Sequence, residues 1–403
     1  MGKKKILFIA DGIALAHAVR IQQLAGYLDE NKYDFYMGIS SEFSNFMNME
    51  NVTYVPIKSL GVKEYQNRLK DISCKHVYDD EVVSMCIESD EEAINLVHPD
   101  IVIGDARVSL GIVCRMHNIP YINIVNAYYS VNTLIKTEVP DISPIRYLPK
   151  KLVEKSFNEK FKEVNENFVA GYNCEAVKRG LPELANIKEL YTNGDYNLFI
   201  DTPSLSPVSE LRNNEKYIGP VLSFPRQQKP DWWGSIPIDR PIVYCSIGST
   251  GADDKVKRIV KILEKLNVYV IFVTAGNECI KRFPENFYVC KYITALDAIA
   301  ISDLVIFNGG SGTLYQALYL GKPVVALATI SDQFYASSEV SNLSVGKIFR
   351  YREMKEKTVT EVIQNLLTDK GVKQKCSIVK NEITKYDSRI LFPAAVEQFI
   401  DSI

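Results

Sequence analysis

A glycine-rich segment in the second half of the chain has the residue types of a phosphate-binding turn. It reads, in order, Phe307, Asn308, Gly309, Gly310, Ser311, Gly312 and Thr313. A β-branched run precedes it, and a stretch with apolar residues at helical spacing follows. Glycines let a ligand approach the backbone, and the free N–H groups at the start of a helix attract phosphate. Since a tight structural turn would use the same residues, the segment alone leaves phosphate binding and a purely structural turn both open.

Two other segments with polar side chains follow predicted strands in the same half. The run 242–247 ends in small residues and hydroxyls, namely Ser246, Gly248, Ser249 and Thr250. The run 323–327 is followed by Asp332 and Gln333. The carboxyl ends of parallel strands meet at one edge of a sheet, where ligands bind. Together the three loops suit a ligand with phosphates and sugar hydroxyls, although Asp332 could instead cap a helix.

The elements that must position these loops follow from hydrophobic periodicity. Short β-branched runs alternate with stretches of helical period, which is typical of parallel sheets with crossover helices. The strands predicted in the first half are 5–10, 33–39, 52–57, 100–104 and 120–125, with helices at 17–30 and 109–117. Those predicted in the second half are 242–247, 268–274, 287–290, 304–307 and 323–327. The pattern predicts an α/β protein with two doubly wound domains.

Irregular segments set the predicted domain boundaries. Residues 126–150 contain three prolines and lack periodicity, so we expect them to shape a binding mouth. A stretch rich in Pro, Gly, Asn and Asp has the composition of an interdomain linker. The predicted parts are an N-terminal domain 1–205, a linker 206–240, a C-terminal domain 241–385 and a last helix 386–403, whose return to the N-terminal domain is left open.

Composition excludes several classes of protein. The 403 residues carry 47 Lys and Arg against 49 Asp and Glu, a net charge of −2, so no broad field attracts nucleic acid. The eight cysteines contain no Cys-x-x-Cys pair, as expected of thiols in a reducing cytoplasm. Asp11 ends the apolar run after Lys5 too early for a signal peptide. No window reaches the length of a membrane span, which leaves only peripheral membrane contact open.

The order of motifs in the second half resembles a known family. The blocks are Tyr217 to Val221, Ile242 to Ser249, Asn308 to Thr313, Ala317 and Leu318 with Gly321 to Pro323, and Asp332 with Gln333. This series looks like that of nucleotide-sugar glycosyltransferases related to UDP-glucuronosyltransferases and to bacterial macrolide and antibiotic glycosyltransferases, a GT1-like group. The resemblance implies the GT-B fold, in which two Rossmann-like domains face each other across a cleft. It also implies that the C-terminal domain holds the nucleotide sugar and the N-terminal domain the acceptor.

The resemblance assigns roles to individual positions. In the first half, family members carry a glycine-rich loop, a His and often an Arg three residues later, which Gly12, His17 and Arg20 match. His17 would be the general base, and Asp105 would orient it and stabilise the imidazolium. The implied acceptor-binding residues are Gly12, Arg107, Asn126 and Tyr128. The implied donor-binding residues are Ser246, Gly248, Ser249, Thr250, Tyr292, Ile293, Asn308, Gly309, Gly310, Ser311, Gly312, Thr313, Gln316, Asp332 and Gln333.

Three positions depart from the family pattern. Asn308 stands where members usually have a His that donates to the diphosphate, Gln316 replaces a ribose-binding Glu, and Ala295 stands in a block that usually keeps a Pro and a Gln. The sequence predicts an inverting, metal-independent glycosyltransferase with no cofactor besides a UDP-type or TDP-type sugar. Its acceptor is a small molecule, a lipid or a glycan, and its state a monomer or a homodimer. A nucleotide-sugar hydrolase or epimerase and a non-catalytic sugar-nucleotide-binding partner protein are the alternatives.

Overall fold

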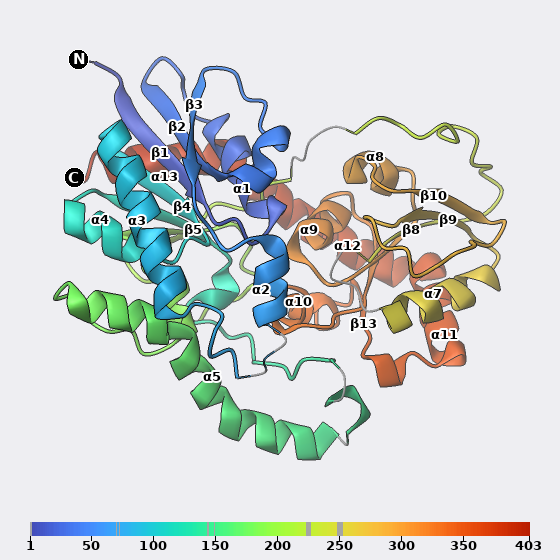
Figure 1. The fold of residues 1–403 in the computed structure, drawn as a ribbon. Helices are drawn as coiled ribbons and strands as arrows, with labels where there is room; N and C mark the ends of the chain where they lie inside the picture. Colours follow the sequence, from blue (N-terminus) through green and yellow to red (C-terminus); the bar gives the residue numbers. More distant parts are fainter. Residues whose placement is uncertain are drawn as a thin grey trace.

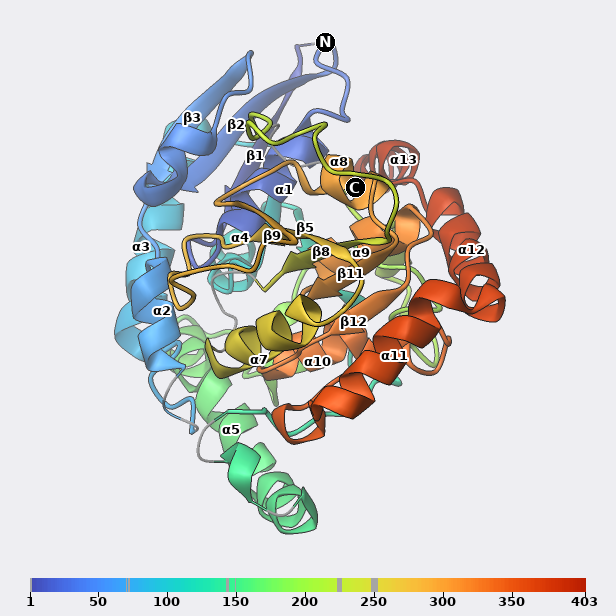
Figure 2. The same cartoon turned by 90° about the vertical axis from the view of Figure 1, so that its right-hand side faces the viewer.

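The structure is a computed structural model that describes residues 2–69, 71, 73–142, 145–148, 150–222, 227–247 and 253–403. Over these residues the chain forms two parallel sheets, one in each half, with helices on both faces (Figure 1). The view turned by 90° shows α11 and α12 along the outside of the second half and α5 projecting below the first (Figure 2).

The N-terminal sheet contains seven strands among the described residues, in the order β3-β2-β1-β4-β5-β6-β7. They are β1 (Lys4–Ala10), β2 (Tyr33–Ser40), β3 (Val52–Ile57), β4 (Ile101–Asp105), β5 (Tyr121–Val125), β6 (Tyr196–Phe199) and β7 (Glu215–Tyr217). The helices of this half are α1 (Leu15–Ala25), α2 (Val62–Arg68), α3 (Asp80–Val97), α4 (Leu110–His117), α5 (Lys150–Lys178) and α6 (Ile187–Tyr191), with 3-10 turns η1 (Ser41–Phe46), η2 (Ala127–Tyr129) and η3 (Ile145–Tyr147). The strand order turns at β1 and β4, so the carboxyl ends of these two strands open a crevice.

The C-terminal sheet contains six strands among the described residues, in the order β10-β9-β8-β11-β12-β13. They are β8 (Ile242–Ser246), β9 (Tyr269–Val273), β10 (Phe287–Cys290), β11 (Leu304–Phe307), β12 (Val324–Ala326) and β13 (Gly346–Ile348). The helices are α7 (Asp253–Glu264), α8 (Ala295–Ala300), α9 (Ser311–Tyr319), α10 (Ser331–Ser337), α11 (Glu356–Thr368), α12 (Lys370–Lys385) and α13 (Ser388–Ile400), with 3-10 turns η4 (Ser338–Val340) and η5 (Tyr351–Glu353). Here the order turns at β8 and β11.

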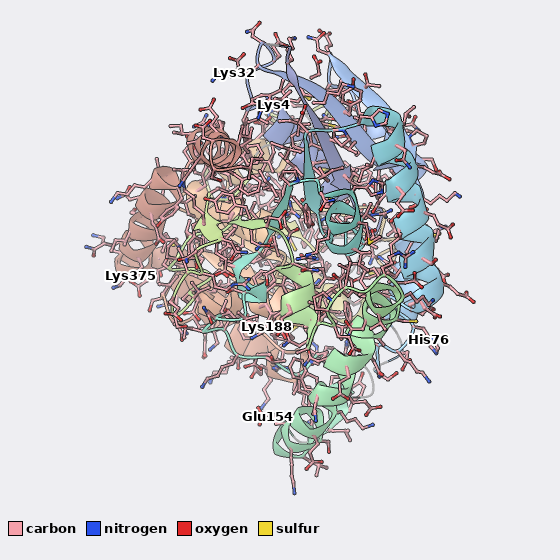
Figure 3. All side chains as sticks on the ribbon, turned by 90° about the vertical axis from the view of Figure 1, so that its left-hand side faces the viewer. Lys4, Lys32, His76, Glu154, Lys188 and Lys375 are labelled. Carbon is pink, nitrogen blue, oxygen red and sulfur yellow. The ribbon has the colours of Figure 1, made fainter. Side chains whose placement is uncertain are left out.

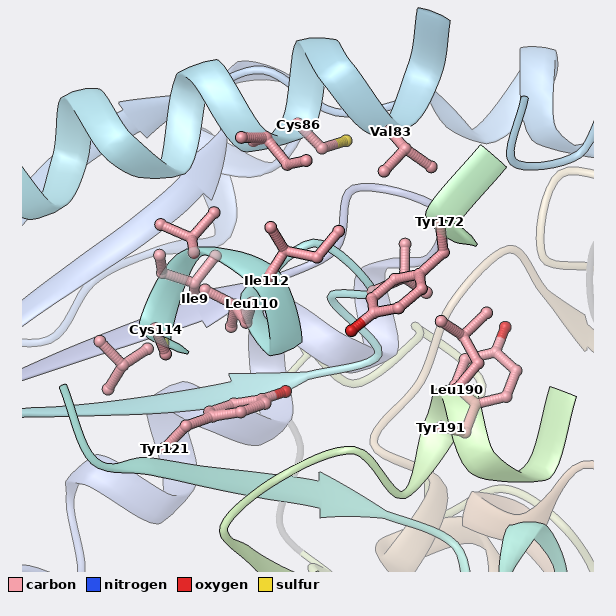
Figure 4. Close-up of a cluster of buried hydrophobic side chains, with 14 of the residues drawn as sticks. Ile9, Val83, Cys86, Leu110, Ile112, Cys114, Tyr121, Tyr172, Leu190 and Tyr191 are labelled. Carbon is pink, nitrogen blue, oxygen red and sulfur yellow. The ribbon is translucent and has the colours of Figure 1, made fainter. Parts of the chain in front are cut away.

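Each sheet is buried on both faces, which explains the apolar runs of its strands. All five residues of β4 are buried, as are all four of β11. One core of the N-terminal half lies between the sheet and α3, α4 and α5, where Val83 and Cys86 of α3 face Ile112 of α4 (Figure 4). Charged side chains, such as those of Lys32 and Lys375, lie on the outer surface (Figure 3).

The last helix, α13, packs on the N-terminal domain and not on the domain that precedes it in sequence. Its Phe392 and Val396 are fully buried in the core that contains Ile6 of β1. The chain therefore crosses between the domains twice, and the two crossings touch: the Ser388 hydroxyl donates to the Pro220 carbonyl over 2.9 Å. At this junction Gly219 has φ +81° and lies against the Tyr386 carbonyl, so only glycine fits.

Three short strands lie outside the sequence predictions. β6 has four residues, and β7 and β13 have three each, too few for a periodic signal. β7 falls inside the predicted linker 206–240 but pairs with β6 and extends the N-terminal sheet. The first helix also differs, since it begins at Leu15 and ends at Ala25 where residues 17–30 were predicted. None of the helices described is long and apolar enough to cross a membrane.

Candidate functional site

The N-terminal half of the site forms where β1 and β4 end side by side. Ala10 is in register with Asp105, and the Asp11 amide donates to the Asp105 carbonyl over 3.0 Å. The chain leaves β1 through Gly12 and enters α1, which places His17 and Arg20 one turn apart on the same helix face. Parallel pairing and helical spacing thus bring three residues from distant sequence positions together.

His17, Asp105 and Arg20 form one hydrogen-bonded group. His17 Nδ1 lies 2.7 Å from Asp105 Oδ1, and Arg20 Nη2 donates to the same oxygen over 2.7 Å. Arg20 Nε donates to Asp105 Oδ2, and its Nη2 lies 2.9 Å from His17 Nδ1. When Nδ1 carries the hydrogen and donates to Asp105, the Nε2 lone pair is available to accept a proton. Nε2 has no hydrogen-bond partner within the described part of the chain.

Neighbouring charges and hydrogen bonds keep Asp105 ionised in spite of its burial. The residue is 1% exposed, and this burial by itself raises its pKa. The charges of Arg20 and His17 and their hydrogen bonds outweigh burial, so the pKa of Asp105 lies below its ordinary value. A carboxylate held in this state fixes the imidazole ring and can stabilise an imidazolium when one forms.

The C-terminal half of the site is built from backbone. Phe307 at the end of β11 is in register with Ser246 at the end of β8, so these strands open onto the same edge. Asn308 and Gly309 follow, and Gly310 is the N-cap of α9. Gly309 has φ +92°, and a Cβ there would lie 3.0 Å from the Gln333 carbonyl. Asn308, Gly310, Ser311, Gly312 and Thr313 are all partly exposed, so the start of α9 is open to a ligand.

A cavity of about 60 Å³ joins the two halves. Arg20 lines it from the N-terminal domain, and Ser311 and Gly312 line it from the first turn of α9. The remaining walls are Ala16, Val19, Ile200, Pro220, Val221 and Tyr315. A larger hollow of about 1000 Å³ lies at the opposite, amino ends of β8, β9 and β10, and none of the predicted site residues that the structure describes lines it.

A buried carboxyl, Asp201, connects the domains beside this cavity. It accepts hydrogen bonds from the Ala127 amide at 2.6 Å, from Asn126 Nδ2 at 3.1 Å and from the Tyr315 hydroxyl of α9 at 2.9 Å. Burial raises the pKa of Asp201 to about 6 in spite of these bonds. Asn126, predicted to bind the acceptor, here orients this carboxyl.

The loop after β12 meets the N-terminal domain as well. Asp332 Oδ1 accepts from the Tyr128 hydroxyl at 2.8 Å and from the Tyr129 hydroxyl at 3.2 Å. The predicted donor residue Asp332 and the predicted acceptor residue Tyr128 are therefore bonded to each other. Gln333 Oε1 accepts from the Thr329 amide at 2.8 Å, which ties its side chain to the start of α10.

A second set of interdomain contacts, the clasp, involves the irregular segment 137–148 in its described residues. Asp141 Oδ2 lies 2.6 Å from Lys255 Nζ, and both side chains are almost fully buried. Arg146 pairs with Asp254, and Arg350 Nη2 donates to Glu138 Oε2 over 2.6 Å. The segment thus packs at the C-terminal domain, next to the predicted donor loops.

Several predicted residues lie elsewhere or are already engaged. Arg107 is a correction: its side chain is fully buried and bonded to Asp90 at 2.8 Å, so it has no surface to offer an acceptor. The Ile293 side chain belongs to the core of the C-terminal domain, and Gln316 is only 3% exposed. Tyr292 is 54% exposed. The predicted donor residues Gly248, Ser249 and Thr250 lie outside the described residues.

Sequence reasoning missed the residues that join the halves. Arg20 entered only as part of a motif, without a role, yet it donates to both oxygens of Asp105 and lies 2.9 Å from His17 Nδ1. Asp201 follows β6, a strand too short to predict, although Asp at a strand end was a usable signal. Within the described residues, no group of three or more His, Cys, Asp or Glu side chains could hold a metal ion.

Comparisons with known proteins agree with this geometry. A model of the glycosyltransferase family 28 C-terminal domain matches residues 242–388. The PGL/p-HBAD biosynthesis glycosyltransferase of Mycobacterium tuberculosis (strain ATCC 25177 / H37Ra) is 31% identical over 373 residues, 92% of this chain and 87% of the relative. The PGL/p-HBAD biosynthesis rhamnosyltransferase of Mycobacterium bovis (strain BCG / Pasteur 1173P2) is 30% identical over 396 residues, 98% of this chain and 87% of the relative.

Solved structures share the fold over nearly the whole chain. The glycotransferase of kitacinnamycin superposes with a TM-score of 0.76 at 15% identity, covering 99% of this chain and 100% of that one. The spinosyn rhamnosyltransferase SpnG complexed with thymidine diphosphate gives a TM-score of 0.70 at 16% identity, covering 98% and 100%. The fold is GT-B, as the resemblance implied.

Two Rossmann-like domains with this topology, together with these relatives, define a GT-B glycosyltransferase. This chain belongs to that class, as a GT1-like member of the family of the mycobacterial PGL/p-HBAD biosynthesis glycosyltransferases.

Proposed function

We propose that the protein transfers a sugar from a nucleoside-diphosphate sugar to an acceptor hydroxyl, with inversion at the anomeric carbon and without a metal ion. The observation that carries the proposal is that one small cavity lies between the two halves of the site. Arg20, which contacts His17 and Asp105, lines this cavity from the N-terminal domain. The start of α9 lines it from the C-terminal domain.

Each half would supply one part of the reaction. Nε2 of His17 takes the proton of the acceptor hydroxyl, whose oxygen attacks the anomeric carbon from one face. The bond between that carbon and the phosphate oxygen breaks, and the nucleoside diphosphate leaves on the other face. Backbone N–H groups at the start of α9 stabilise the charge that develops on the phosphate. Asp105 stabilises the imidazolium that results.

The donor would be a UDP-type or TDP-type sugar, with no other cofactor. Two similar proteins favour a deoxysugar carried on thymidine diphosphate. One relative is called a rhamnosyltransferase, and one structural neighbour is complexed with thymidine diphosphate. The acceptor is a small molecule, a lipid or a glycan that reaches His17 from the N-terminal domain. The unpaired state of all eight cysteines suits a cytoplasmic protein.

The test incubates the purified protein with UDP- and TDP-sugars, with and without a library of phenolic, polyketide, lipid and glycan acceptors. Transfer predicts release of nucleoside diphosphate that depends on the acceptor, and a product whose anomeric configuration is opposite to that of the donor by NMR. Equal release without acceptor would identify a hydrolase. Donor binding without release under any condition would identify a non-catalytic binding protein.

A further inference from the structure

Arg20 has one nitrogen that the His17–Asp105 pair does not use. Its Nε and Nη2 donate to the two oxygens of Asp105, whereas Nη1 has no hydrogen-bond partner in the part of the chain described here. The side chain is 15% exposed, and it lines the interdomain cavity. A guanidinium is planar, so two fixed nitrogens also fix the direction of the third.

The cavity that Arg20 lines suits an anion. Opposite Arg20 lie Ser311 and Gly312 in the first turn of α9, where backbone N–H groups have no helical acceptor. Among the described residues that line the cavity, none is acidic. The nearest carboxyls are engaged: Asp105 is bonded to Arg20 itself, and Asp201 accepts from the Tyr315 hydroxyl.

We propose that Arg20 is a donor-binding residue, whose Nη1 donates to the diphosphate of the nucleotide sugar across the domain interface while its other nitrogens hold Asp105, the partner of His17. The inference rests on the proposed function and adds a residue from the acceptor domain to the donor site. The charge of Arg20 and the start of α9 then face the same phosphate from opposite sides.

This arrangement couples donor binding to the general base. A phosphate bonded to Nη1 restrains the guanidinium, and the restrained guanidinium restrains Asp105 and, through it, the imidazole ring. The base is therefore best ordered when the donor is present. An acceptor hydroxyl that reaches His17 before the donor meets a less ordered base.

The experiment measures the affinities of thymidine diphosphate, uridine diphosphate and thymidine by calorimetry for the wild type, Arg20→Gln and Arg20→Lys. Loss of one charge-assisted hydrogen bond should weaken diphosphate binding of Arg20→Gln by about 10-fold or more, and leave thymidine binding unchanged. Arg20→Lys keeps the positive charge but not the planar set of guanidinium donors, so it should bind diphosphate better than Arg20→Gln. Arg115→Gln removes the same charge from the surface of α4 and should bind as the wild type does.

The outcomes separate this inference from the proposed function. Equal diphosphate affinity in Arg20→Gln and the wild type would overturn the role of Arg20 while the donor class stands. A parallel loss of thymidine affinity in Arg20→Gln would show a general structural defect and would also overturn it. A wild type that binds neither diphosphate would overturn both proposals.

Discussion

The two halves of the site use different parts of the chain to do their work. The N-terminal half depends on side chains: His17 and Arg20 both bond to the single carboxylate of Asp105. The C-terminal half depends on backbone, at Gly309, Gly310 and the first turn of α9. A substitution in the first half removes a side chain that takes part in the reaction, whereas a substitution in the second half adds atoms where the ligand must fit. The halves should therefore fail in different measurements.

The largest expected effect is on the side-chain half. His17→Ala should lower turnover by about 10² to 10⁴, because it removes the group that accepts the acceptor proton. Donor affinity should change little, since Arg20 keeps both of its hydrogen bonds to Asp105 without His17 and the other predicted donor residues belong to the C-terminal domain. Single-turnover kinetics and calorimetry check the two quantities separately. His117→Ala, at the end of α4 and 4.0 Å from Glu91, is the matched control and should keep wild-type turnover. Near wild-type turnover in His17→Ala would remove the base assignment.

The next effect concerns Asp201, which links the halves. Its pKa is raised from 3.8 to about 6, so the folded state holds this proton more tightly than the unfolded chain does. Its contribution to stability is full below pH 3.8 and is lost as the pH rises through about 6. Between these limits the wild type should lose about 3 kcal/mol relative to Asp201→Asn, which does not titrate.

Urea unfolding of the wild type and Asp201→Asn from pH 3.5 to 7.5 measures this difference. The free energy of unfolding of the wild type should fall relative to that of Asp201→Asn as the pH rises. A constant difference across the range would mean that the Asp201 carboxyl is not titrated differently by folding.

The smallest effect sharpens the account of the backbone half. Gly309→Ala should cost about 1 to 3 kcal/mol of stability, because its φ of +92° suits only glycine and the new Cβ would meet the Gln333 carbonyl at 3.0 Å. Gly310→Ala should cost less than about 0.5 kcal/mol, since its Cβ has only Asn308 Oδ1 nearby, at 3.5 Å. It should nevertheless weaken binding of thymidine diphosphate. Unchanged affinity in Gly310→Ala would place the phosphate elsewhere.

The sequence predicts strands best where burial makes them unambiguous. The runs 101–105 and 304–307 are buried throughout, and their apolar residues identify them within one residue. β7 escapes because its three residues include two charged side chains, one of them buried only by pairing with Arg212. Its neighbour in the sheet is distant in sequence, so no local pattern reports it.

The site shows the same limit. The pairing of His17 with Asp105 is implied by the family resemblance, and the parallel pairing of β1 with β4 explains why the two residues meet. The predicted role of Arg107 in acceptor binding does not fit the structure, because its partner Asp90 lies in the middle of α3. A charged pair inside a core has no sequence signature. The bonds of Asp332 to Tyr128 and of Asp141 to Lys255 depend on how two domains pack, which periodicity does not encode.

The meeting of the two chain crossings at Pro220 and Ser388 has a mechanical consequence. Two chain segments that are bonded to each other at one point favour rotation of the domains about one axis and oppose twisting. Contacts near this point, such as that of Tyr315 with Asp201, move little in such a rotation. The clasp contact of Asp141 with Lys255 lies farther away, because Lys255 belongs to α7, which is far from α13 in both views (Figures 1 and 2). In such a rotation the clasp contact between Asp141 and Lys255 would separate before the contacts beside Pro220 do.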